Sequence, residues 1–168
     1  MVEHLIDLDR YFIKDPQNNP VFLADLATVK SKMNANQKLV FIMDTHYIDW
    51  AHTDFGGISK EELKEKEGKL ILETTNTSDI MILLDDGGKQ LTSPKLADYV
   101  QKLLNRGAQQ IVFVIGGAFG FSDAVRSRSN SSWSLSKLTF PHHLVRTIFL
   151  EQLYRAFTIL NGERYHND

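Results

Sequence analysis

The chain has 168 residues, 42% hydrophobic and 24% charged, so it is long enough to bury a core and fits one domain. With 19 Lys and Arg against 21 Asp and Glu, the formal net charge is -2, which excludes a uniformly basic protein that coats nucleic acid. The lack of cysteine excludes disulfide scaffolds, cysteine nucleophiles and thiolate metal sites, and agrees with a reducing compartment. We expect a soluble, cytoplasmic protein, because the sequence has neither an apolar run of membrane-spanning length nor the pattern of a signal peptide.

The charge is distributed unevenly along the chain. Residues 1–100 carry 11 basic and 17 acidic residues, a net charge of -6, whereas residues 101–168 carry 8 and 4, a net charge of +4. This asymmetry predicts different tasks for the two parts, and any polyanionic partner is expected to bind locally.

The sequence pattern of residues 1–72 predicts two strands and two helices. Residues 4–12 and 38–48 are strand candidates, and a helix is expected over residues 21–33. Ser59 and Glu62 have the spacing of a capping box, which predicts a second helix that begins there and continues through residue 72.

The second part continues the alternation. Residues 80–84 and 111–115 are short and wholly apolar, as in central parallel strands that are covered on both faces. Between them, Ser93 as a cap and Pro94 as the first helical residue predict a helix that ends near Gly107.

A last long helix is predicted from His142 to about Leu160. The order of elements is typical of an α/β fold with a mainly parallel sheet, and no repeat or linker divides residues 1–168 into more than one domain. Because ligands bind beyond the carboxyl ends of such strands, the functional residues are expected after Leu84 and Ile115.

Both of these positions are followed by a predicted glycine-rich loop, residues 85–89 and residues 116–121. Glycine lets a ligand approach the backbone, but neither loop has the phosphate-binding or dinucleotide-binding pattern, and strand-to-helix turns use glycine in any case. Asp85 and Asp86 could ligate Mg²⁺, although a solvated turn is the simpler interpretation.

A serine-rich segment over residues 131–141 allows two interpretations. Hydroxyl residues alternate with Trp133, Leu135 and Phe140, which suits a half-buried edge strand that ends at a proline. The same residues suit a loop that surrounds a ligand with backbone groups, and the pattern alone does not decide between the two.

Other catalytic patterns are missing. His142 and His143 are adjacent and so cannot share a metal as an i, i+4 pair would, and no metalloprotease or serine-hydrolase motif is present. Glu151 and Arg155 are spaced for a surface ion pair.

Several short motifs over about residues 60–168 are informative together, because their order along the chain and the spacing between them form a recognisable pattern. They include Leu84-Asp85-x-x-Gly88-Lys89, residues 112–117 (VFVIGG), residues 134–142 (SLSKLTFPH), residues 151–157 (EQLYRAF) and Tyr165-His166. With these motifs the chain resembles the RlmH family, ribosomal large-subunit pseudouridine methyltransferases of the SPOUT class. Before residue 58 only the order of elements agrees.

The resemblance implies a SPOUT-type α/β knot, in which residues from about 80 to 168 form a deep trefoil knot that binds S-adenosyl-L-methionine. It also implies a homodimer and requires neither a metal nor a membrane. The implied cofactor contacts are Leu84, Gly116, Leu135, Ser136, Lys137, Leu138, Thr139 and Phe140.

The implied reaction is methylation of N3 of a pseudouridine in 23S rRNA on assembled ribosomes. By the same resemblance, Arg155 is expected near the target base, with His142, Tyr165 and His166 closing the site or contacting RNA. Phe149, Leu153 and Phe157 on the last helix suit either a dimer interface or the core. Two alternatives stay open, a SPOUT methyltransferase for another RNA site and a catalytically silent RNA-binding homologue.

Overall fold

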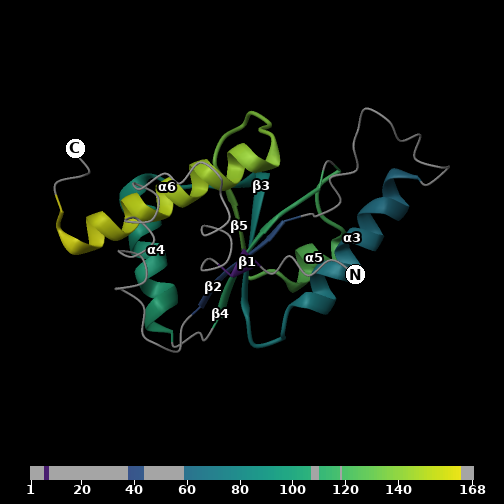
Figure 1. The fold of residues 1–168 in the computed structure, drawn as a ribbon, viewed down its shortest axis with the longest axis horizontal. Helices are drawn as coiled ribbons and strands as arrows, with labels where there is room; N and C mark the ends of the chain where they lie inside the picture. The colour runs from purple at the N-terminus through teal and green to yellow at the C-terminus, as the bar shows by residue number, and fades with distance from the viewer. Residues whose placement is uncertain (1–5, 8–37, 44–58, 107–109, 118, 164–168) are drawn as a thin grey trace.

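The fold is built on a five-stranded sheet (Figure 1). The structure is a computed structural model that describes residues 6–7, 38–43, 59–106, 110–117 and 119–163. Its strands are β1 (Ile6–Asp7), β2 (Lys38–Met43), β3 (Ile80–Gln90), β4 (Gln110–Ile115) and β5 (Ser131–Ser134), and they lie in the order β1-β2-β4-β3-β5.

The sheet is parallel except at one edge. β2, β4, β3 and β5 run in the same direction, with Ile82 of β3 opposite Phe113 of β4, while β1 pairs with β2 in the antiparallel direction. The prediction of an α/β fold with a mainly parallel sheet is therefore confirmed. The helix predicted over residues 21–33 lies outside the described residues, as do most of the first predicted strand and residues 44–48.

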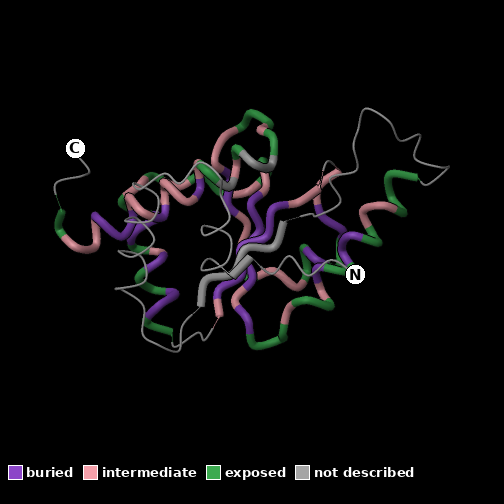
Figure 2. Tube along the Cα trace, viewed as in Figure 1, coloured by how far each residue is buried: buried purple, intermediate pink, exposed green. Residues whose placement is uncertain are grey.

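Helices cover both faces of the sheet (Figure 1). α4 (Ser93–Asn105) and α6 (His142–Asn161) pack on one face, and α3 (Lys60–Thr74) and α5 (Asp123–Arg128) pack on the other. Because side chains of a strand alternate between faces, Ile82 and Phe113 join the cluster under α4 and α6, whereas Met81 and Val112 join the cluster under α3 and α5. The central strands are buried on both faces, as their apolar sequences predict (Figure 2).

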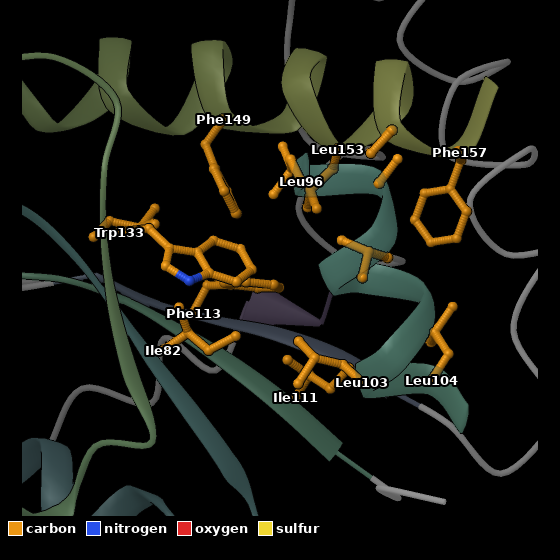
Figure 3. Close-up of a cluster of buried hydrophobic side chains, with 14 of the residues drawn as sticks. Ile82, Leu96, Leu103, Leu104, Ile111, Phe113, Trp133, Phe149, Leu153 and Phe157 are labelled. Carbon is orange, nitrogen blue, oxygen red and sulfur yellow. The ribbon is translucent and has the colours of Figure 1, made fainter. Parts of the chain in front are cut away.

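The cluster under α4 and α6 is rich in aromatic residues (Figure 3). The Phe149 ring lies edge-on to Phe113, with centroids 4.8 Å apart, and Tyr99 meets Trp133 edge-on at 5.1 Å. The three apolar residues of α6 that suited either core or interface belong to this core, since Phe149, Leu153 and Phe157 are only 1%, 2% and 0% exposed.

The helix starts follow local capping chemistry. Ser59 and Glu62 form the predicted capping box, in which Ser59 N–H donates to Glu62 Oε2 (2.9 Å) and Glu62 N–H donates to Ser59 Oγ (3.1 Å). The prediction that Ser93 caps α4 is wrong, because Thr92 is the extended residue whose hydroxyl accepts the Lys95 N–H. The helix therefore begins at Ser93, one residue before the predicted first helical residue, Pro94.

The prediction of a glycine-rich loop directly after Leu84 is also wrong, because β3 continues to Gln90. The strand pairs with β5 at Ile82–Leu84 and, beyond the end of its pairing with β4, pairs with β5 again: Lys89 pairs with Trp133 and Gln90 with Ser134, after a register shift between Leu84 and Lys89. The serine-rich segment combines both of its interpretations, with strand β5 over its first four residues and a loop over residues 135–140.

Candidate functional site

A cavity of about 220 Å³ lies where β3, β4 and β5 reach the same end of the sheet. Most of its wall comes from three segments that are distant in sequence, namely residues 84–86 in β3, the turn after β4, and the loop after β5, and Val145 of α6 also contributes. Seven of the eight predicted cofactor residues line it, namely Leu84, Gly116, Leu135, Ser136, Leu138, Thr139 and Phe140. The eighth, Lys137, is exposed and does not line the cavity.

The turn after β4 depends on close packing at Gly116. A Cβ at this position would lie 2.9 Å from Cζ of Phe121, a buried ring that also lines the cavity. Gly120 has φ of 75°, which favours glycine, and its N–H donates to the Gly117 carbonyl at 3.0 Å. Ser122 then caps α5 by accepting the Val125 N–H, so the turn is fixed at both ends.

The loop after β5 is shaped by its own serines. Ser134 Oγ donates to the Ser136 carbonyl at 2.8 Å, and Ser136 Oγ accepts the Leu138 N–H at 3.0 Å. These bonds hold the loop beside the cavity and leave Leu138 70% exposed at its rim. An exposed leucine that lines a cavity is available for apolar contact with a ligand.

The two aspartates of β3 also line the cavity, and the solvated turn expected for them does not describe Asp85. Its side chain is only 9% exposed and forms an ion pair with Arg126 of α5, while its Oδ1 accepts the Gly87 N–H at 3.4 Å. Asp86 is exposed. Within the part of the chain that the structure describes, no group of three His, Asp or Glu residues is placed to hold a metal ion.

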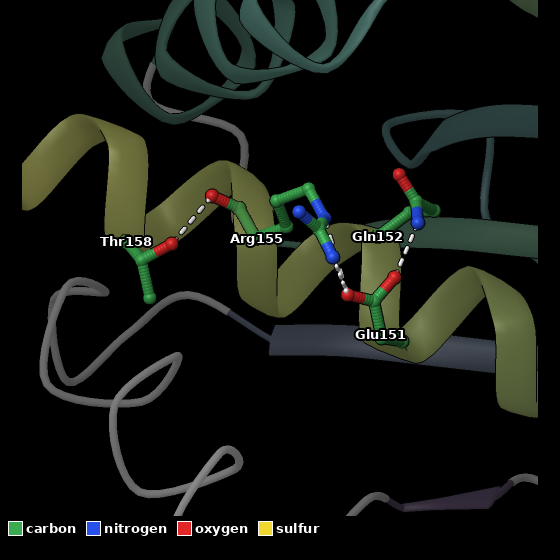
Figure 4. A network of polar contacts seen from close by, with 4 residues as sticks. All are labelled: Glu151, Gln152, Arg155 and Thr158. Atoms are coloured by element: carbon green, nitrogen blue, oxygen red, sulfur yellow. Dashed lines mark hydrogen bonds and ion pairs between the residues drawn. The ribbon is translucent and has the colours of Figure 1, made fainter. Parts of the chain in front are cut away.

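Of the predicted catalytic residues, Arg155 does not line this cavity. Arg155 is on α6, where its Nη2 and Nε donate to Glu151 Oε1 at 2.6 and 3.1 Å (Figure 4). The ion pair expected here is therefore present, with side chains that are 28% and 35% exposed. His142 is the first residue of α6, described by its backbone, and Tyr165 and His166 lie beyond the described residues.

Sequence reasoning missed several residues of the cavity. Trp133 and Val145 line it, although the aromatic and aliphatic patterns of their segments indicate only burial. Trp133 and Leu135 also line a second cavity of about 300 Å³ between β5, α4 and α6. Asp85 and Asp86 carried a usable signal, because two carboxylates directly follow the wholly apolar run of residues 80–84.

The residues of the first cavity suit a ligand that has an apolar ring and polar ends. Aliphatic and aromatic side chains form most of its wall, and the Ser136 and Thr139 hydroxyls, the glycine backbone and the two carboxylates supply polar groups. This combination is typical of a small-molecule site, in which apolar walls hold the ligand and a few polar groups orient it. None of the helices in the described ranges is long and apolar enough to cross a membrane.

Comparison with known proteins assigns the class. A family described as predicted SPOUT methyltransferase matches residues 27–166, which include every element that forms the cavity. Together with the parallel sheet and the cavity at its carboxyl edge, this match defines the chain as a methyltransferase of the SPOUT class.

Within that class, the chain belongs to the RlmH family. It is 43% identical over 146 residues to the ribosomal RNA large subunit methyltransferase H of Christiangramia forsetii, covering 83% of this chain and 93% of that protein. The proteins of the same name from Bacteroides thetaiotaomicron and Cytophaga hutchinsonii are 47% and 49% identical over 111 and 110 residues, each covering 66% of this chain and 71% of the relative.

Proposed function

We propose that the protein transfers a methyl group from S-adenosyl-L-methionine to N3 of a pseudouridine in 23S rRNA on assembled ribosomes. The observation that carries this proposal is the convergence of seven predicted cofactor residues, from three separate segments, on one cavity. The relatives, which are named as large-subunit rRNA methyltransferases, support the class of substrate. A ribosomal substrate would be met in the cytoplasm, which is where we propose that the protein acts.

Leu84, Gly116 and residues 135–140 would hold the cofactor. Leu135, Leu138 and Phe140 offer apolar contact, and the backbone around Gly116 offers hydrogen-bonding groups at a position where an added Cβ would meet the Phe121 ring. When bound, S-adenosylmethionine supplies an electrophilic methyl group. The protein then has to orient the pseudouridine ring and accommodate the proton that leaves N3.

A second copy of the chain would complete the site. Ten residues of α6 separate Val145, which lines the cavity, from Arg155, and this corresponds to roughly 15 Å of helix rise. Arg155 of one chain therefore cannot serve the cavity of the same chain without a large rearrangement, whereas a homodimer could bring it to the cavity of its partner.

In this arrangement Arg155, His142, Tyr165 and His166 would contact the target base or the RNA around it. Arginine and tyrosine stack on bases, and histidine can share a proton near neutral pH. The basic part of the chain, residues 101–168 with a net charge of +4, would face the phosphate backbone, and dimerisation doubles that charge.

The proposal is tested by binding and by mapping. Isothermal titration should detect binding of S-adenosylmethionine or S-adenosylhomocysteine, and heat from neither ligand would overturn the proposal. Ribosomes from cells that lack the protein should then lose one methylated pseudouridine in 23S rRNA and regain it with the purified protein. Loss at a tRNA or another rRNA position would favour a different SPOUT specificity, and ribosome binding without methyl transfer would indicate a silent homologue.

A further inference from the structure

Among the described residues that line the first cavity, every charged side chain is acidic. Of the described residues that line it, two are carboxylates, Asp85 and Asp86, and none is Lys, Arg or His. A cavity with such a lining favours a cationic ligand over a neutral one and disfavours phosphate groups, because the interaction between charges is stronger in a partly buried site than in water.

The compensating charge lies outside the cavity. Arg126 pairs with Asp85 from α5, is not one of the lining residues, and has a side chain that is 46% exposed. Its guanidinium also lies over the Phe121 ring, 5.7 Å from the centroid. Arg126 thus pairs with Asp85 beside Phe121 and Gly120, two residues that line the cavity, and its own side chain stays open to solvent.

We propose that Asp85, tuned by Arg126, makes the cavity select the sulfonium form of the cofactor over the demethylated product. S-adenosylmethionine carries one more positive charge than S-adenosylhomocysteine, and this charge is the main difference between the two ligands. A carboxylate that borders the cavity stabilises the charged ligand and so promotes exchange of product for fresh cofactor. This inference rests on the proposed function and assigns a specificity role to Asp85, which belongs to a family motif but is not among the cofactor contacts that the resemblance implies.

Two substitutions with opposite expected effects test the role of charge. The measured quantity is the ratio of the dissociation constants of S-adenosylhomocysteine and S-adenosylmethionine, obtained by titration calorimetry at neutral pH. Asp85→Asn should lower the preference for S-adenosylmethionine by roughly tenfold, because one negative charge is removed near the ligand. Arg126→Gln should raise that preference by about twofold or more, because the carboxylate loses its compensating cation.

Asp98→Asn is the matched control, since Asp98 is an exposed carboxylate of α4 that pairs with Lys102 at 2.7 Å, away from the cavity. It should leave the ratio unchanged. Asp86→Asn provides an independent variant that leaves the Asp85–Arg126 pair intact, and it should lower the ratio by about twofold or more. Circular dichroism confirms that each variant is folded, and if Asp85→Asn does not fold, the Asp86 and Arg126 variants decide.

A purely structural role for the ion pair predicts a different pattern. Loss of either partner would then weaken both ligands equally, and the ratio would stay constant in every variant, which would overturn this inference while leaving the proposed function intact. If the wild-type protein binds neither ligand, the proposed function fails and the inference fails with it.

Discussion

Gly88 of β3 lies directly against the backbone of Trp133 in β5. A Cβ added to Gly88 would lie 2.6 Å from the carbonyl carbon of Trp133 and 2.8 Å from that of Ser132, and backbone atoms inside a sheet cannot move aside as a flexible side chain can. This contact occurs just before β3 resumes pairing with β5 at Lys89. It therefore ties the position of the edge strand to the absence of a side chain at one residue.

Gly88→Ala should lower the free energy of unfolding by about 2–3 kcal/mol, because it forces β5 away from β3. Urea denaturation measures the change. Gly87→Ala is the matched control, since its Cβ would meet only Asp85 Oδ1 at 4.0 Å, and it should change stability by less than about 0.5 kcal/mol. Equal midpoints for the two variants would contradict the packing described here.

Gly116→Ala should disturb the cavity through Phe121, whose ring would lie 2.9 Å from the new Cβ. We expect S-adenosylmethionine to bind on the order of tenfold more weakly, equivalent to about 1.4 kcal/mol. Adding Phe121→Leu should recover part of the lost affinity by making room for the methyl group. Calorimetry on the single and double variants checks this, and independent effects of the two changes would argue against a shared contact.

Leu138→Ala and Phe157→Ala should separate binding from stability. Leu138 is 70% exposed but lines the cavity, so its truncation should weaken cofactor binding and change stability by less than about 0.5 kcal/mol. Phe157 is fully buried and does not line the cavity. Its truncation should therefore lower the free energy of unfolding by about 3–5 kcal/mol. Urea denaturation and calorimetry on both variants provide the two readouts.

Asn130 acts as an extension of the sheet beside β3. Its Oδ1 accepts the Met81 N–H at 2.8 Å, and its own N–H donates to the Met81 carbonyl at 2.8 Å. Asn130→Ala leaves the Met81 N–H without its acceptor and should lower the free energy of unfolding by about 1–3 kcal/mol. Asn130→Asp keeps an acceptor oxygen and should recover most of this loss. Thermal denaturation of the pair is the measurement, and equal losses would show that the acceptor is unimportant.

Arg155→Gln should separate methyl transfer from cofactor binding. Because Arg155 does not line the cavity, affinity for S-adenosylmethionine should be unchanged, while the proposed contact with the target base should make methylation of ribosomes at least about tenfold slower. Glu151→Gln removes the charge that pairs with Arg155 but keeps the guanidinium, so its effect on the rate should be smaller. A normal rate in Arg155→Gln would remove this residue from the proposed site.

The fold was predictable where the sequence carries a local signal. The wholly apolar runs at 80–84 and 111–115 predict doubly covered strands, and the Ser59–Glu62 spacing predicts the observed capping box. The extension of β3 to Gln90 was not predictable in this way, because it depends on pairing with β5, which follows about forty residues later in the chain. Glycine and aspartate disfavour strands locally, and tertiary pairing overrides that preference.

The candidate site was also predictable only in part, because it too depends on contacts between segments that are distant in sequence. Family motifs identify the loop after β5 and the glycine turn, whereas physical patterning alone leaves both ambiguous. The inward position of Asp85 could not be foreseen, because it depends on Arg126 approaching from α5. The knot and the dimer remain predictions from the family, since both concern how whole segments pass one another rather than any local spacing.

The position of Trp133 has a spectroscopic consequence. The chain contains two tryptophans, so a Trp50→Phe variant would retain a single indole, which belongs to the aromatic core and borders both cavities. Its fluorescence would respond to unfolding through loss of packing and to ligand entry through a change in local polarity. One intrinsic probe could therefore follow denaturation and cofactor exchange in the same sample without a chemical label.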